Sequence, residues 1–496
     1  MAAAATSEDS AGGTFQSASG TGRPRLGIVV TGQGSVTAVE AYAALRDSYD
    51  PVFLVAPTAE DGGEAESPES AKLASRMRAL SRRAEVCWLP SPALRDVPPA
   101  LRDLSGVTTF CADGVEVTSW LAGAVGLPAL GAGGGVSLYD KVAQRSDLGP
   151  DLSPGYVALP DPCCSAELAA SDPHEGCDWP EWERAAARLG FPAVLKPARG
   201  QASRGVRRVE DVAGLRAARH EIVSARHRTS VSSGRATAPA AGGELAWLLE
   251  EFLTGHDRWP RAAYVSVESI VSRSDIRHVA LTRKLPMAEP FREVGQYLLP
   301  RGNEDQASAD EHRALLEAAS QALSRLRVEN AVTHTELKLT SQGPKVIEVN
   351  ARVGGLIRDL VRAGRGVDLA RAAAAVAVGG RPDCPDEAAE KAAGSGLVFQ
   401  YGPLAPVRAA VFQRAHGVDA VLSLPGVDRY LPHVAAGELL PGGTETLTMA
   451  VVSGACRDEE ELAAVVTELE RVLSYEFRLH PDGQPVRCDA RGVPIM

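Results

Sequence analysis

Residues 334–350 read HTELKLTSQGPKVIEVN, and both halves of this stretch alternate between polar and apolar side chains around a turn that contains Gly and Pro. Such a pattern predicts a β-hairpin. Because successive side chains on a strand point to opposite faces, the apolar residues of the two strands lie together on one face. That face is predicted to carry Leu337, Leu339, Ile347 and Val349. The opposite face is predicted to carry Glu336, Glu348 and Asn350.

The spacing of the two acids points to a metal site. A three-residue turn over residues 341–343 places Glu336 directly opposite Glu348, with their Cβ atoms about 5 Å apart; a slip of one residue in register is the alternative. Like charges at that separation repel by roughly 0.5–1 kcal/mol unless a cation lies between them. Two carboxylates and the amide oxygen of Asn350 suit Mg²⁺, with phosphate oxygens and water completing its coordination. The segment alone is equally consistent with a solvated edge hairpin whose acids face water.

The composition excludes several classes of protein. The chain has 496 residues, a formal net charge of −11, 45% hydrophobic and 23% charged residues, which are the proportions of a globular protein of several domains. The negative charge disfavours nucleic-acid binding. No stretch is predicted to span a membrane, and residues 1–23 have the composition of a tail and not of a signal peptide, so a cytoplasmic location is expected. The eight Cys form no CxxC pair, which argues against zinc and favours reduced thiols.

The N-terminal part is predicted to be a small α/β domain. Residues 26–30 and 51–56 read as apolar strands, separated by a turn at Gly32 and Gly34 and by a helical segment. The turn has the composition of a phosphate cradle. It lacks the third glycine of the dinucleotide fingerprint, and no acidic residue clearly follows the second strand, so a plain tight turn is favoured.

A lysine and a glycine loop in the middle of the chain suit phosphate. Lys196 closes the apolar strand 191–197, where an ammonium group is partly buried unless it meets an anion. The following loop, residues 198–206, has the glycines that allow backbone N–H groups to fold over phosphates. A loop of this composition is usually just a hairpin turn, but its position after the lysine favours the phosphate interpretation.

Further residues follow in an order that suits a nucleotide. Backbone groups of the acid-ended strand 248–253 are suited to read an adenine edge, and Asp257 to reach ribose hydroxyls. Lys141 opens a predicted helix, and Arg352 leaves the acidic hairpin. Taken alone, an exposed lysine or arginine is an ordinary solvated charge.

The whole ordered set resembles the ATP-grasp superfamily over roughly residues 26–380. The most specific part is the succession LKP, glycine loop, EEFLxGxD, TELK and EVNARVGG. Within the superfamily, the Val-Gly-Gly that follows Arg352 resembles the L-amino acid ligases, whereas biotin-dependent carboxylases place a Gln-Val-Glu-type segment there. The resemblance implies an ATP-grasp fold of the α/β (α+β) class.

The resemblance also implies roles for individual residues. ATP-binding roles fall to Lys141, Lys196, Ser203, Arg204, Gly205, Val206, Glu250, Glu251, Phe252, Leu253 and Asp257. Two Mg²⁺ ions, for which Mn²⁺ is a substitute, would be held by Glu336, Glu348 and Asn350. The implied catalytic residues are Lys196 and Arg352, the latter facing the transferred phosphate and the acyl intermediate. Ordinary strand or surface roles are favoured over pocket roles for Lys284, Glu293 and His334.

Four domains are expected along the chain. They are a disordered tail (1–23), a Rossmann-like pre-ATP-grasp domain (24–135), the ATP-grasp domain (136–380) and a small C-terminal α/β domain (381–496). A mobile lid over about 182–253, with a flexible insertion at 224–243, would close over the acyl intermediate. The boundaries follow from composition and from the resemblance together.

The resemblance implies an ATP-dependent carboxylate–amine ligase that forms an amide or peptide bond through an acyl phosphate. The expected substrates are a carboxylic acid, as in an amino acid, and an amine, as in an amino acid or peptide. Neither nucleic acid nor a membrane is expected as a partner, and a homodimer is the default state. The alternatives are an ATP-grasp carboxylase or ligase of nucleotide or cofactor synthesis, and an ATP-binding protein without catalysis.

Overall fold

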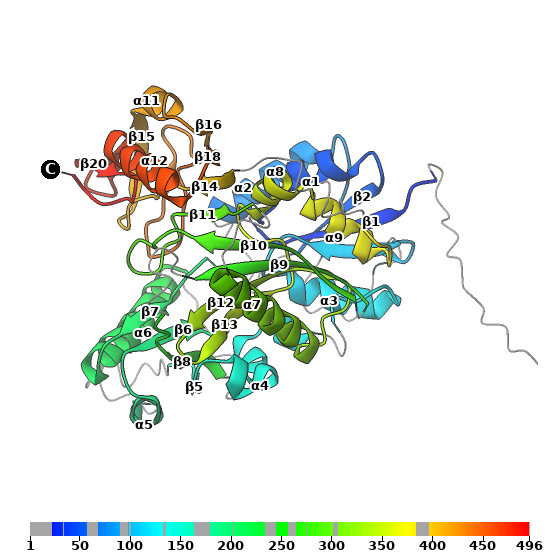
Figure 1. The fold of residues 1–496 in the computed structure, drawn as a ribbon, viewed down its shortest axis with the longest axis horizontal. Helices are drawn as coiled ribbons and strands as arrows, with labels where there is room; N and C mark the ends of the chain where they lie inside the picture. Colours follow the sequence, from blue (N-terminus) through cyan, green and yellow to red (C-terminus); the bar gives the residue numbers. More distant parts are fainter. Residues whose placement is uncertain are drawn as a thin grey trace, which may run out of the picture.

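The computed structural model describes most of the chain. It covers residues 22–32, 34–56, 68–89, 98, 101–131, 135–162, 179–200, 202–233, 245–255, 264–273, 275–300, 306–382 and 396–495. Four β-sheets organise these residues (Figure 1). No helix within them is long and apolar enough to cross a bilayer. The predicted tail lies almost entirely outside the described residues.

The N-terminal sheet is parallel, with the strand order β3-β2-β1-β4. Its strands are β1 (Arg25–Val30), β2 (Asp50–Val55), β3 (Glu85–Trp88) and β4 (Gly106–Thr109). The associated helices are α1 (Ala38–Leu45), α2 (Pro68–Leu80) and α3 (Gly114–Val125). β1 and β2 are almost entirely buried because strands of a parallel sheet are covered on both faces. The predicted α/β fold of this part is confirmed.

A second sheet has the order β5-β8-β6-β7 and packs on two helices. Its elements are β5 (Tyr156–Pro160), α5 (Trp179–Leu189), β6 (Ala193–Pro197), β7 (Arg207–Val209), α6 (Val212–Ser233) and β8 (Leu245–Glu251). The lid was expected to begin at about residue 182, but β5 pairs with β8, so the sheet starts earlier in the chain. The insertion expected at 224–243 is wrong for its first ten residues, because α6 continues to Ser233.

The central sheet has eight strands in the order β13-β12-β9-β10-β11-β14-β18-β16, and all its pairs are antiparallel. Its strands are β9 (Val265–Ser272), β10 (Asp275–Lys284), β11 (Gly295–Leu298), β12 (Ala331–Thr340), β13 (Gly343–Asn350), β14 (Leu397–Tyr401), β16 (Val427–Pro432) and β18 (Ala450–Cys456). Helices α8 (Ile357–Arg365) and α9 (Leu369–Ala377) cover one face, and α7 (Gln306–Arg325) covers the other. Because β14 pairs with β11, the sheet is continuous across the predicted boundary at residue 380.

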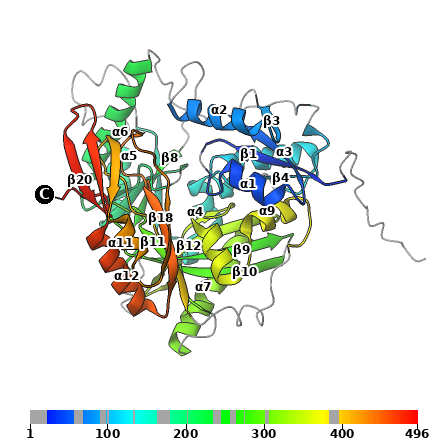
Figure 2. The ribbon, with the colours of Figure 1, turned by 90° about the horizontal axis from the view of Figure 1, so that it is seen from above.

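The C-terminal part adds a fourth sheet in the order β17-β15-β19-β20. Its elements are β15 (Ala410–His416), α11 (Val418–Leu422), β17 (Leu439–Leu440), α12 (Glu459–Val472), β19 (Ser474–Leu479) and β20 (Pro485–Asp489). Asp458 accepts a hydrogen bond from the N–H of Glu461 and so caps the start of α12. The N-terminal sheet lies at one end of the central sheet, and the β5–β8 and C-terminal sheets lie at the other (Figures 1 and 2).

Candidate active site

The predicted hairpin exists, and its two acids face each other. β12 and β13 pair antiparallel, with Glu336 opposite Glu348 and His334 opposite Asn350. The predicted pairing of the acids is correct, but the predicted turn is wrong. Thr340 pairs with Gly343, so the turn has two residues. The extra residue Ile347 forms a bulge in β13, which brings Glu336 and Glu348 opposite each other.

The bulge also changes which side chains face the core. An extra residue in one strand reverses the alternation beyond it. Val346 and Val349 are buried in the core with Leu337, and Leu339 packs at its edge, whereas Ile347 is only half-buried and lies outside that core. The prediction of Ile347 as a core residue is therefore wrong.

Helix α4 (Lys141–Leu152) fixes the hairpin from the side. Gln144 donates to the carbonyl of Val349 at 3.0 Å and accepts from its N–H at 2.8 Å. The Arg145 guanidinium donates to the carbonyl of Ile347, and the Lys345 ammonium donates to the carbonyl of Pro150 at 2.9 Å. Side chains of α4 therefore satisfy the free backbone edge of β13, which would otherwise be left unpaired. This arrangement holds the acids in place.

A buried cluster of one acid and two cations lies beside the hairpin. Glu250 accepts from Arg145 Nε at 2.7 Å and pairs with Lys196 Nζ at 2.7 Å, and all three side chains are buried. Burial lowers the pKa of Lys196, and the carboxylate of Glu250 offsets only part of this effect. For Glu250, burial alone would raise the pKa, but Arg145 and Lys196 outweigh it and the pKa is lowered. Two buried cations share one anion, so the cluster favours a further anion such as phosphate.

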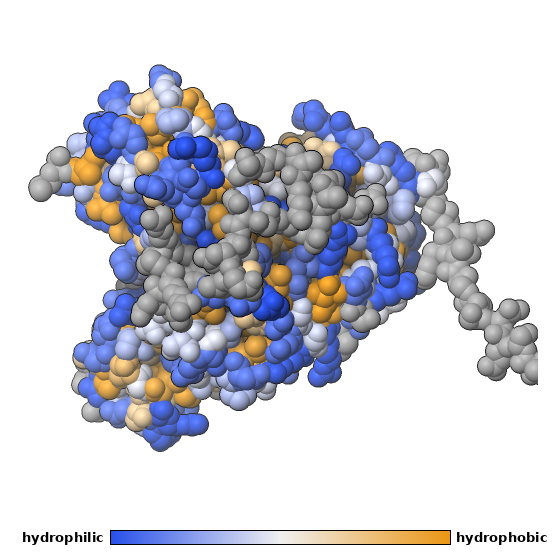
Figure 3. All heavy atoms as spheres, viewed as in Figure 1, coloured by the Kyte–Doolittle hydropathy of each residue, from blue (hydrophilic) through white to orange (hydrophobic). Residues whose placement is uncertain are grey.

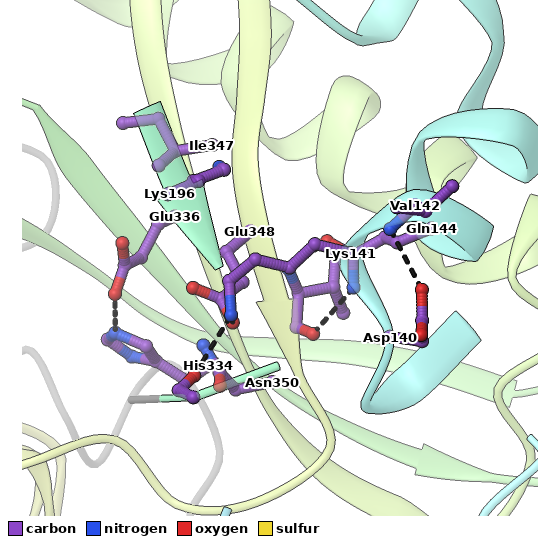
Figure 4. A network of polar contacts seen from close by, with 12 residues as sticks. Asp140, Lys141, Val142, Gln144, Lys196, His334, Glu336, Ile347, Glu348 and Asn350 are labelled. Carbon is purple, nitrogen blue, oxygen red and sulfur yellow. Dashed lines mark hydrogen bonds and ion pairs between the residues drawn. The ribbon is translucent and has the colours of Figure 1, made fainter. Parts of the chain in front are cut away.

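The two lysines predicted to bind phosphate lie close to the predicted metal ligands (Figure 4). Lys141 reaches from the start of α4 to Glu348, at 3.2 Å between Nζ and Oε1. Lys141 also donates to the carbonyl of Gly200, in the loop after Lys196. The nearby carboxylate of Glu348 also raises the pKa of Lys196 and so opposes the effect of burial.

Arg352 contacts the third predicted metal ligand. Its guanidinium donates to the side-chain oxygen of Asn350 at 3.4 Å, while its buried Nε has no hydrogen-bond partner among the described residues. Nowhere in the described part of the chain do three or more His, Cys, Asp or Glu side chains cluster in a way that would hold a metal ion alone. The two acids and the amide would therefore need oxygen ligands from a bound nucleotide.

A buried His links one acid to the sheet interior. His334 contacts Glu268 at 2.7 Å through Nδ1 and Glu336 at 3.2 Å through Nε2. Burial alone would lower the pKa of His334, but the two carboxylates raise it to about 9. The pKa of Glu336 is in turn lowered, against the effect of burial, by the hydrogen bond and charge of His334. His334 therefore belongs to the site, contrary to the favoured prediction.

Lys284 and Glu293 also lie at the site and not at an ordinary surface. Lys284 is almost fully buried, pairs with Glu293 and donates to Gln296 Oε1 at 2.6 Å. The Tyr264 hydroxyl donates to Glu293 at 3.2 Å. Burial and the nearby carboxylates, Glu336 among them, raise the pKa of Tyr264 well above its ordinary value. Lys284, Glu293 and Tyr264 therefore belong to the same polar region as Glu336.

The segments predicted to contact ATP border this region. The ring of Phe252 lies near two cations, with Arg208 at 4.2 Å and Lys338 at 5.7 Å from the ring centroid. Asp257 lies outside the described residues, and Glu251 and Leu253 follow the cluster acid along the chain.

The predicted glycine loop contacts both the segment before β11 and the C-terminal part. Ser203 Oγ donates to the carbonyl of Phe291 at 2.9 Å. Arg204 pairs with Glu445 at 2.7 Å, and the Thr446 N–H donates to the carbonyl of Ala202 at 3.1 Å. Gly205 and Val206 complete the turn of this loop, where Val206 donates to the carbonyl of Ser203. The ATP-binding roles of all these residues stay predictions.

Three functional candidates escaped the sequence reasoning. Arg145 follows Lys141 by one helical turn, and that spacing is a signal of a shared face. Glu268 is the single charge in the apolar strand 265–272, which is a signal of a buried functional acid. Tyr264 immediately precedes that strand; no sequence signal distinguishes it from an ordinary strand-edge tyrosine.

Residues 189–359 match the family model of the ATP-grasp domain. The chain contains an ATP-grasp domain. It is 30% identical to human carnosine synthase 1 over 229 residues, which are 45% of this chain and 24% of that protein. It is 29% identical to alanine–anticapsin ligase of Bacillus subtilis over 181 residues, which are 35% of this chain and 36% of that protein. The chain thus spans well under half the length of these curated relatives.

Solved structures show the same fold over almost the whole chain. An L-amino acid ligase from Bacillus licheniformis superposes with a TM-score of 0.59 at 19% identity, covering 91% of this chain and 98% of that one. A phosphoribosylglycinamide synthetase from Anaerococcus prevotii superposes with a TM-score of 0.54 at 12% identity, covering 91% and 99%. The predicted ATP-grasp fold is confirmed.

Proposed function

We propose that this ATP-grasp protein is an ATP-dependent carboxylate–amine ligase that joins an amino acid to a second amino acid or a peptide. The observation that carries the proposal is the direct opposition of Glu336 and Glu348, with Lys141 held 3.2 Å from the second acid. An opposed pair of acids beside cations suits the handling of phosphate charge and contributes nothing to a core.

Mg²⁺ fits this site because of the chemistry of its donors. Glu336, Glu348 and Asn350 offer two carboxylates and an amide oxygen, the hard ligands that Mg²⁺ prefers. When bound, Mg²⁺ neutralises negative charge on phosphate oxygens. The proposal includes two such ions shared between these residues and the nucleotide.

The cations of the site would bind and orient phosphate. Lys196 belongs to a buried cluster with one more positive than negative charge, so an added phosphate balances it. Lys141 would exchange its contact with Glu348 for a phosphate oxygen once the acid is otherwise neutralised. Arg352, whose buried Nε has no hydrogen-bond partner among the described residues, would stabilise the transferred group.

The proposed reaction has two steps. The terminal phosphoryl group of ATP passes to a substrate carboxylate and gives an acyl phosphate and ADP. The amine nitrogen then attacks the acyl carbon, phosphate leaves, and a proton is released as the amide forms. No protein nucleophile is needed, so positioning and charge neutralisation by the side chains above are sufficient. Contacts of the loop through Ser203 with Phe291 and through Arg204 with Glu445 would keep water from the intermediate.

The curated relatives support amino acids as substrates, since they are named a carnosine synthase and a ligase of alanine and anticapsin. The test is to incubate the protein with Mg·ATP and the proteinogenic amino acids in pairs, and to measure ADP and ligated products by mass spectrometry. We expect ADP formation that requires amino acids and matches the amide product one to one. ADP formation at the same rate with and without amino acids would exclude the ligase function. Light scattering would test the expected homodimer.

A further inference from the structure

A cavity of about 390 Å³ lies where three parts of the molecule meet. Its floor is the end of the central sheet formed by β14, β18 and β16, and α8 and the start of α1 line its sides. The volume falls within the range of small-molecule sites. On the face shown in Figure 3, hydrophilic residues predominate over the described part of the surface. The cavity itself is lined by both polar and apolar residues.

Gln400 is the unusual residue of the cavity floor. On β14, Leu397, Phe399 and Tyr401 face the C-terminal core, so Val398 and Gln400 face the cavity. Gln400 is 4% exposed, and its side-chain oxygen has no hydrogen-bond partner among the described residues. A buried acceptor without a donor is costly, and an apolar residue there would avoid that cost. A ligand N–H group would supply the missing donor.

Gln400 belongs to a polar row that crosses five strands. Lys284, Gln296, Gln400, Ser453 and Arg429 lie opposite one another in turn across β10, β11, β14, β18 and β16. The neighbouring Gln296 shows what a satisfied member looks like: its oxygen accepts from Lys284 at 2.6 Å and its amide donates to the carbonyl of Gly355 at 3.1 Å. The side-chain oxygen of Gln400 has no such partner among the described residues, which marks its part of the row as a binding position.

The cations around the cavity are not equally available. Arg358 is held by Asp368 through two hydrogen bonds of 2.9 and 2.6 Å, and Arg362 pairs with Asp359 at 3.0 Å. Arg429 has no ion-pair partner within the described ranges and lies two strands from Gln400, or about 10 Å at the usual strand spacing. A carboxylate at Arg429 and an N–H at Gln400 fit the two ends of one short zwitterion.

The cavity shares a chain segment with the candidate active site. Arg352 contacts Asn350, and four residues later Leu356, with a φ of 59°, lines the cavity just before α8 begins. Gln296 holds the intervening carbonyl of Gly355. A ligand in the cavity therefore touches the segment that positions Arg352.

We propose that this cavity binds a small ligand that carries both a carboxylate and an N–H donor, namely an amino acid or a short peptide. The carboxylate pairs with Arg429, and the N–H group donates to Gln400. Whether the bound molecule is a substrate, a product or an effector depends on the proposed ligase function, but the binding itself does not.

The test uses calorimetry on the full chain, with the proteinogenic L-amino acids titrated singly and diglycine as a peptide probe. We expect at least one probe to bind in the absence of nucleotide. Gln400→Leu should weaken that binding by about tenfold or more, since a hydrogen bond to a charged group is lost. The same variant should melt at the same or a higher temperature, because the unpaired acceptor is gone. A merely structural glutamine would instead lower the melting temperature.

Gln484→Leu is the matched control, because it removes the same amide from an exposed turn outside the cavity. It should bind like the parent protein, whereas Arg429→Gln should weaken the binding of every bound probe, since each of these probes carries a free carboxylate. Absence of binding for every probe, or unchanged binding by Gln400→Leu, overturns the proposal. Probe binding that depends on Gln400 in a protein without ligase activity would keep this proposal and reject the proposed function. Mass spectrometry separates a consumed substrate from an effector that is recovered intact.

Discussion

The ammonium group of Lys141 lies 3.2 Å from a carboxylate oxygen of Glu348, so a candidate phosphate ligand and a candidate metal ligand form one ion pair. The pair joins α4 to the hairpin at the point where β13 ends. The charges of Lys141 and Glu348 balance each other. Lys141 can turn to phosphate and Glu348 to Mg²⁺ only if the nucleotide and the metal enter together. The pair therefore provides a direct test of the site.

Glu348→Ala should abolish turnover and leave the fold nearly intact. The side chain is 23% exposed and belongs to no apolar core, so the free energy of unfolding should fall by about 1 kcal/mol or less. Loss of a charge that acts on the reacting phosphate should lower kcat by roughly 100-fold or more. Glu317→Ala, an exposed acid on α7, is the control. Parental turnover by Glu348→Ala would show that the hairpin is not the metal site.

Glu250→Gln and Lys196→Met should differ in their effect on stability. Glu250 is the only carboxylate that the structure shows in contact with both Arg145 and Lys196 within the described residues. Its neutralisation leaves two buried cations unpaired and should cost about 3–5 kcal/mol in urea unfolding. Lys196→Met removes a desolvated charge whose pKa is already lowered, so stability should hold while ATP affinity falls. Equal destabilisation by both variants would contradict a cluster with excess positive charge.

The hairpin shows which features of a strand pair can be predicted from the alternation of polar and apolar residues. The pairing of Glu336 with Glu348 was predictable because polar and apolar residues alternate in both strands. The prediction relied on a three-residue turn, whereas the molecule uses a two-residue turn and a bulge at Ile347. Both routes give the same register at the acids. The two routes differ in the face to which Ile347 points. No local sequence pattern predicts the bulge, which turns this side chain away from the core.

Contacts between distant segments were beyond the sequence. The Arg145 guanidinium reaches Glu250 across 105 positions of chain, and Glu268 meets His334 across 66. Such pairs depend on how sheets pack, which local propensity does not encode. The membership of β14 in the central sheet also depends on packing. The composition indicated a separate C-terminal domain after residue 380, but β14 pairs with β11.

Asp368→Asn should weaken the protein in a pH-dependent way. Burial alone would raise the pKa of Asp368, but hydrogen bonds from Arg358 outweigh it and the pKa is lowered. The native carboxylate therefore stabilises the fold above the usual Asp pKa of about 3.9, and this contribution is lost as the pH falls through the lower folded value. The variant keeps the cap of α9, because Asn also caps helices, so a loss of about 1–3 kcal/mol at neutral pH would report the charge alone.

The measurement for Asp368→Asn is urea unfolding at a series of pH values. The difference between variant and parent should be constant above about pH 5 and shrink in acid. Asp359→Asn is the control, since its pair with Arg362 is exposed and should be worth no more than about 0.5 kcal/mol. A difference that grows on acidification would contradict a carboxylate held ionised by Arg358.

Gly354→Ala and Gly355→Ala should differ sharply although they are neighbours. A Cβ on Gly354 would lie 2.4 Å from His334 Nδ1 and 2.7 Å from a side-chain carbon of Ile357, whereas a Cβ on Gly355 meets nothing within 4 Å among the described residues. The first variant must displace His334 or the start of α8, at a cost of about 1–3 kcal/mol, and His334 is the partner of Glu336. We therefore expect Gly354→Ala to lose both stability and turnover, measured by thermal melting and ADP release, and Gly355→Ala to keep both. Equal activity of the two variants would show that the position of His334 does not matter to the reaction.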